Sequence, residues 1–152
     1  MTHYPLLFGF RDLVAGNGFI AGIDLSGRAL LADEGDGFWM YGVNPGGIAA
    51  GGAGAGEAQA EFRRMYTSVL FDIAAEAKDF REFERQVRQF VEETNTPTAA
   101  EWDEAVASVR NGKVDADWLP KRKAESPIGV KVTLVEHPVP SVNALDEAEL
   151  AA

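Results

Sequence analysis

Apolar and polar residues alternate along this chain with two different periods, which predicts strands first and helices afterwards. Short apolar runs separated by glycine-containing turns predict four strands within residues 6–43, and an Asn-Gly pair at 17–18 is a strong hairpin signal. We expect the other turns at Ser-Gly, residues 26–27, and at residues 35–37. Because the connections are short, neighbouring strands should run antiparallel. The predicted strands are Leu6–Val14, Phe19–Leu25, Arg28–Glu34 and Phe38–Val43.

After the glycine-rich residues 44–56 the apolar period becomes helical, with one apolar face and charged residues on the rest of the surface. Such a stripe predicts packing on one face of the sheet. We expect a second helix to start at Asp79 with Glu82 as a capping-box partner, and a third to run from Thr98 to Gly112. The apolar face of the first helix is Ala58, Phe62, Met65, Tyr66, Val69, Ile73 and Ala77.

The C-terminal part predicts one more strand. Residues 113–127 are polar and charged, which indicates a loop, whereas residues 128–136 alternate as a closing strand should. We therefore expect a single α+β domain over residues 1–138. It would hold an antiparallel meander sheet packed by one long helix, with two additional helices at residues 79–112 inserted before the closing strand. Residues 139–152 predict a flexible acidic tail.

Composition excludes several classes of site. The chain has 152 residues and no cysteine, so disulfides, thiolate metal sites and cysteine nucleophiles are excluded. No apolar run approaches the ~18–20 residues of a membrane span, and no signal sequence is recognisable, so we expect a cytoplasmic protein. The net charge is −10, without a basic stripe for a nucleic-acid backbone. An acidic surface serves solubility, and it also suits steering of a basic protein partner.

The glycine-rich stretch admits two interpretations. Six of the 16 glycines lie between Gly46 and Gly56, directly before a helix, which suggests a phosphate cradle. A Walker loop, however, needs Lys and then Ser or Thr after its last glycine, and Glu57 and Ala58 follow here. A dinucleotide fingerprint needs a parallel βαβ unit. We therefore favour a structural corner, and nucleotide or small-molecule binding by residues 46–56 is the alternative.

No catalytic or metal-binding pattern is recognisable in the sequence. The acidic residues Asp33, Glu34 and Asp36 lack the alternating oxygen ligands and closing glutamate of a calcium loop, so they indicate a polar hairpin tip. The histidines are His3 and His137, and no serine lies in a nucleophile elbow for which either could act as the general base. We predict a protein without catalytic residues, metal or cofactor.

Large aromatic side chains fall on one face of the fourth predicted strand. Trp39 and Tyr41 share this face, while Phe38 and Met40 lie on the other. If the helices cover only one face, the second carries apolar side chains that mark an interface. Alternatively, the second and third helices wrap over it. The sequence leaves both possibilities open.

The strand, corner and helix of residues 28–77 resemble the antitoxin domain of the HicB-like family. The resemblance implies a β-β-β-α-β core, similar to a truncated ribonuclease-H-like fold without its catalytic acids. It further implies a homo-oligomer that binds a small basic RNA-cutting toxin. Many members bind operator DNA through a C-terminal module that this chain lacks, so DNA binding is not expected. The matching residues are Gly37, Trp39, Tyr41, Gly47, Gly52, Glu57 and Ala58.

From the pattern and the resemblance together we predict a partner-binding surface formed by Trp39, Tyr41 and Asn44. An orphan oligomerisation module is a further alternative to the antitoxin hypothesis. The predicted structural loop consists of Gly47, Gly52, Gly54, Gly56 and Glu57.

Overall fold

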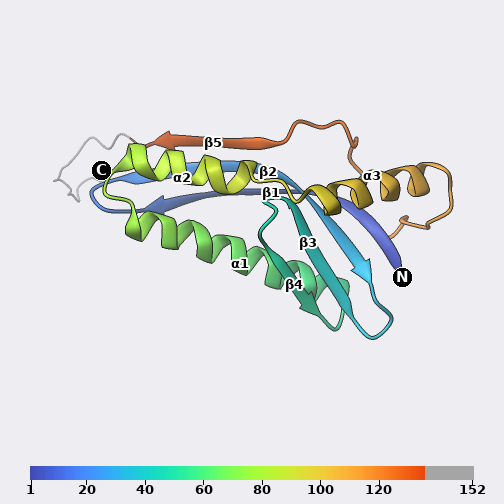
Figure 1. The fold of residues 1–152 in the computed structure, drawn as a ribbon. Helices are drawn as coiled ribbons and strands as arrows, with labels where there is room; N and C mark the ends of the chain where they lie inside the picture. The colour runs from blue at the N-terminus through green and yellow to red at the C-terminus, as the bar shows by residue number, and fades with distance from the viewer. Residues whose placement is uncertain (136–152) are drawn as a thin grey trace, which may run out of the picture.

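The computed structural model describes residues 1–135, which form an antiparallel curled sheet and three helices (Figure 1). The α+β class is therefore confirmed, as is the order of strands, long helix, two further helices and closing strand. His137 and the predicted tail at 139–152 lie outside the described residues. The elements are β1 Thr2–Ala15, β2 Ile20–Asp33, β3 Phe38–Asn44, β4 Ala49–Gly52, α1 Ala55–Glu76, α2 Phe80–Glu92, α3 Thr96–Arg110 and β5 Gly129–Leu134.

Strand β2 carries partners on both of its sides. β1 pairs with it along its whole length in an antiparallel hairpin. On the opposite side, residues 21–26 of β2 pair with β5, whereas residues 28–33 pair with β3. β4 adds to the outer side of β3. The sheet is thus two half-sheets that share β1 and β2, with β5 completing one half and β3 and β4 the other.

The predicted turn at residues 26–27 is wrong, because both residues lie within β2. A Cβ atom on Gly27 would lie 2.3 Å from the backbone oxygen of Asn44 and 2.6 Å from the ring of Phe8. Glycine therefore stands here so that the β3 backbone and the Phe8 ring of β1 can approach closely, not so that the chain can turn. The second and third predicted strands form one continuous strand with a register shift between Arg28 and Ala29.

The helices divide between the two faces of the sheet, as the two separate cores show. α1 and α2 cover one face and enclose the main core, in which Phe62, Tyr66 and Phe83 are almost completely buried. α3 packs on the opposite face, where Trp102 and Ala105 form a smaller core with β-strand residues. The strand residues of this second core are Leu30 and Val43.

The apolar face of α1 differs in part from its prediction. Met65 is 38% exposed, whereas Leu70 and Ala74 are buried, so that the buried residues recur at every fourth position from Ala58 to Ala74. α1 also starts at Ala55, within the stretch 44–56 that was predicted as a loop. With 22 residues it is a long helix, yet no helix of residues 1–135 is both long and apolar enough to span a membrane.

The starts of the next two helices are set by side-chain caps. Asp79 accepts a hydrogen bond from the backbone N–H of Glu82, which confirms the predicted start of α2. α3 begins two residues before Thr98, because Asn95 accepts from the N–H of Thr98 and thereby caps the helix. Pro97 fits this first turn, where its missing N–H costs no helical hydrogen bond.

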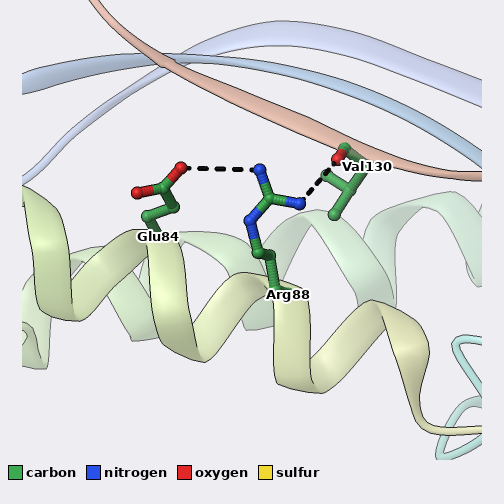
Figure 2. A network of polar contacts seen from close by, with 3 residues as sticks. All are labelled: Glu84, Arg88 and Val130. Carbon is green, nitrogen blue, oxygen red and sulfur yellow. Dashed lines mark hydrogen bonds and ion pairs between the residues drawn. The ribbon is translucent and has the colours of Figure 1, made fainter.

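Helix α2 also holds the closing strand. Arg88 donates from Nη1 to the backbone oxygen of Val130 at 3.3 Å and from Nη2 to Glu84 at 3.5 Å (Figure 2). Side chains of the same helix and strand meet beneath this contact, where Val87, Val91 and Val132 are buried. The apolar contacts carry most of the stability of this junction, since exposed ion pairs contribute little.

We predict that Gly27→Ala destabilises the protein by ~2 kcal/mol or more, because the added methyl group would overlap the Asn44 backbone. Gly22→Ala is the matched control in the same strand, since its nearest contacts are at 3.8 Å. It should stay within ~0.5 kcal/mol of the wild type. Urea unfolding of both variants measures the difference, and equal stabilities would contradict the close approach at Gly27.

Candidate partner-binding surface

Trp39 and Tyr41 lie side by side on β3, on the face that α3 only partly covers. Their ring centroids are 6.2 Å apart, the planes are 22° from parallel, and Trp39 is 42% exposed. Gly51 of β4 makes this arrangement possible, because a Cβ there would lie 2.7 Å from the indole ring. The indole therefore lies directly over the β4 backbone and presents its outer face to solvent.

Carboxylates surround this aromatic pair. The hydroxyl group of Tyr41 donates a hydrogen bond to Glu34 Oε2 at 2.8 Å. Burial raises the pKa of the Tyr41 phenol above its ordinary value, and the hydrogen bond and the negative charges of Glu34 and Glu101 raise it further. Glu34 belongs to the β2–β3 hairpin and Glu101 to α3. We call these four residues, Glu34, Trp39, Tyr41 and Glu101, the aromatic–acidic surface.

This arrangement answers the question that the sequence left open about the aromatic face of β3. α3 packs on this face through Trp102, but α2 lies on the other side of the sheet. Trp39 consequently keeps almost half of its surface accessible. The sequence did not predict the role of Glu101, since its position beside β3 depends on how α3 docks. The acidic hairpin tip that contains Glu34 was recognised, but not its contact with Tyr41.

Asn44 does not belong to this surface, although we predicted it there. It is 7% exposed, and its amide group is taken up by internal partners. Arg28 donates from Nε and Nη2 to Asn44 Oδ1 at 3.0 and 2.7 Å, and Asn44 Nδ2 donates to Thr94 Oγ1 at 2.6 Å. The guanidinium of Arg28 also lies 5.1 Å from the ring centre of Trp102. Asn44 thus joins β2, β3 and the linker before α3.

Backbone contacts extend the junction around Asn44. The N–H of Asn95 donates to the oxygen of Val43, and the N–H of Gly46 donates to the oxygen of Glu93. A Cβ atom on Gly46 would lie 2.4 Å from the nitrogen of Asn95. The corner after β3 is therefore packed against the α2–α3 linker and fixes where α3 starts.

The rest of the glycine-rich stretch forms a short strand and a helix start. Residues 49–52 are β4, which the sequence did not predict. A Cβ atom on Gly52 would lie 2.7 Å from the nitrogen of Ala58, whereas Gly47 and Gly56 have open space around them. Gly54 caps α1, and the carboxylate of Glu57 accepts its backbone N–H at 2.9 Å. A carboxylate of the chain thus occupies a place where a phosphate would sit.

The described residues contain no cluster of three or more His, Asp or Glu side chains placed to hold a metal ion. Asp33 accepts from the backbone N–H of Gly35 and so shapes the hairpin tip. The ring of His3 contacts the sulfur of Met1 at 3.2 Å. The contact of Asp33 belongs to a turn, and that of His3 belongs to the N-terminal strand β1.

Searches against protein-family models, curated proteins and solved structures find no match to this chain. The HicB-like resemblance therefore stays a prediction. Among the residues that carry it, Trp39 and Tyr41 lie in the aromatic–acidic surface, whereas Gly52 and Glu57 build the start of α1.

We predict that Glu34→Gln lowers the pKa of Tyr41 towards its ordinary value of about 10, because a charge and a strong acceptor are removed. The raised pKa stabilises the folded wild type below pH ~10, and this contribution is lost as the pH rises through the folded-state pKa. A pH titration of the tyrosine ring carbons by NMR measures the shift. The buried Tyr66 is the internal control, and an unchanged Tyr41 pKa would contradict the assignment.

We predict that Asn44→Ala destabilises the protein by ~2 kcal/mol or more, because the guanidinium of Arg28 loses its acceptor in a partly buried place. Asn111→Ala, at the exposed end of α3, should stay within ~0.5 kcal/mol of the wild type. Urea unfolding compares the two variants. If Asn44→Ala were as stable as the control, Asn44 would be available for a role at the surface.

Proposed function

We propose that this protein is a non-catalytic binding domain that captures a small basic protein through the aromatic–acidic surface. The observation that carries the proposal is the exposed indole of Trp39, stacked on a tyrosine whose hydroxyl group is bonded to a carboxylate. Aromatic side chains that stay accessible on an ordered strand are frequent anchors of protein interfaces.

The chemistry of this surface selects a cation. The face of an indole attracts a guanidinium or ammonium group, with ~0.5–1 kcal/mol at exposed sites and ~2 kcal/mol when the pair is desolvated. Glu34 and Glu101 place negative charge beside the same rings, so that an arginine or lysine could contact ring and carboxylate together. An anionic or neutral partner would gain neither interaction.

The charge of the whole chain supports the same partner class. With 24 acidic and 14 basic residues, the chain attracts a basic protein from a distance. Complementary charge of this kind speeds association and makes binding dependent on salt. The aromatic pair would then supply the short-range contact that holds the partner.

The family resemblance names the partner more closely. A HicB-like antitoxin would act in the cytoplasm as a homo-oligomer and hold a small basic RNA-cutting toxin, and we include this identity in the proposal. Binding of nucleotide phosphates by residues 46–56 is less well supported, because Glu57 already accepts the Gly54 N–H and would repel a phosphate.

We predict that Trp39→Ala reduces capture of the partner by about tenfold or more, which corresponds to ~1.4 kcal/mol. The tagged protein would be expressed in its native host and the co-purifying proteins quantified by mass spectrometry. Trp118→Ala is the matched control, because Trp118 is 50% exposed but lies against Tyr4, away from the aromatic–acidic surface. Its capture should equal that of the wild type.

Two further measurements separate binding from folding. Thermal unfolding shows whether Trp39→Ala remains folded at the temperature of capture. The double variant Glu34→Gln, Glu101→Gln keeps both rings, and it should weaken capture and flatten its dependence on salt. Equal recovery of one small basic protein by all these variants would place the interface elsewhere, and recovery of no basic protein by the wild type would count against the proposal.

A further inference from the structure

A second candidate site lies at the end of the sheet where β1 begins. It is a groove of about 490 Å³ between residues 4–8 of β1, the side of α3 and the loop at 116–125. This volume is within the range of sites for small organic ligands, ~300–1,000 Å³. The groove shares no residue with the aromatic–acidic surface.

The walls of the groove are mainly apolar. Trp102 and Val106 come from α3, and Leu119 comes from the loop that follows. Trp118 closes the same end of the molecule, with its ring edge-on to Tyr4 at 5.1 Å. The walls therefore offer an apolar chain a place out of water. Further apolar lining residues are Leu6, Leu7, Phe8, Met40, Val109, Ala116, Pro120 and Ala124.

Part of the groove lining is basic, although the chain as a whole is strongly acidic. Residues 110–125 contain five of the 14 basic residues and three acidic ones. The four cations that line the groove are Arg110, Lys121, Arg122 and Lys123. These side chains form what we call the basic rim.

Two of the four rim cations are already neutralised within the chain. Arg110 pairs with Glu125 at 2.5 Å, and Lys121 pairs with Asp117 at 3.1 Å. The hydrogen bond from Arg110 keeps the pKa of Glu125 below its usual range, so this carboxylate stays charged. Arg122 and Lys123 have no ion pair with another residue of 1–135. Their charges remain available to an anion.

The groove is poorly suited to a peptide that would add a strand to β1. Such binding depends on free backbone groups along the strand edge. Here Pro5, within the segment that lines the groove, has no backbone N–H to offer an added strand. Further along, Arg63 donates to the oxygen of Gly9 at 3.3 Å. The edge of β1 thus lacks a donor at Pro5 and a free acceptor at Gly9 that an added strand would need.

We propose that this groove binds a single-chain amphiphile with an anionic head group, a carboxylate or a phosphate. The apolar chain lies against the walls formed by β1, Trp102 and Val106. The head group contacts Arg122 and Lys123, where charge-assisted hydrogen bonds replace its hydration. A cationic or uncharged amphiphile of the same length lacks this second contact.

Isothermal titration calorimetry with dodecanoate and with dodecyl phosphate, each below its critical micelle concentration, tests this proposal. We expect saturable binding at a single site, and the tighter of the two probes identifies the preferred head group. Dodecylammonium and dodecanol should bind about tenfold more weakly, and acetate should not bind measurably. Tryptophan fluorescence in Trp39→Phe supplies a second readout, because Trp102 lines the groove.

Variants at the exposed basic rim avoid the risk of unfolding. Arg122→Gln with Lys123→Gln should weaken dodecanoate about tenfold or more and leave dodecanol unchanged. Lys113→Gln is the matched control, because it removes a positive charge from the same segment outside the groove. Val106→Phe should weaken both compounds by filling the space for the chain.

Several outcomes would overturn the proposal. These are equal binding of dodecanoate and dodecylammonium, an unchanged affinity in the double rim variant, and the absence of saturable binding to the folded wild type. Tight binding of an acidic peptide without binding of either amphiphile would assign the groove to a protein partner. None of these measurements depends on Trp39, so the groove and the partner-binding surface succeed or fail separately.

Discussion

The pairing of β2 on both of its sides is the constraint on which the rest of the structure depends. β1 occupies one side throughout, so β3 and β5 must share the other and meet beside Gly27. There the end of β3 approaches so closely that a side chain would not fit. Asn44 sits at this meeting point and binds Arg28 and the linker before α3. The position of α3 follows from this junction. Because α3 contributes residues to the groove and to the aromatic–acidic surface, the positions of both sites follow from it as well.

Local patterns predicted much of the fold, because helices and hairpins depend on neighbouring residues. The start of α2 at Asp79 and the α+β class could be predicted in this way. The continuation of β2 through residues 26–27 could not be predicted. A glycine that turns the chain and a glycine that admits a distant backbone look alike in sequence. The same holds for the start of α3, which its contact with the corner at Gly46 fixes.

The candidate site was predictable only where it depends on strand alternation. Trp39 and Tyr41 share a face because side chains alternate along β3, and this needs no tertiary information. The acidic neighbours Glu34 and Glu101 come from a hairpin and a helix, and only the folded chain brings them together. Asn44 was misassigned for the opposite reason: its polar side chain indicated a surface, whereas Arg28 and Thr94 satisfy it inside.

The contact of Arg63 with β1 has a consequence for how the folded chains behave at high concentration. Within residues 1–135, β1 is a 14-residue edge strand, and such an edge is a template on which further chains can stack into fibres. Arg63 of α1 obstructs this template by taking the carbonyl oxygen of Gly9. Resistance to self-stacking is therefore a property of helix docking: a chain whose helices detach loses its core and exposes a growth edge in the same event.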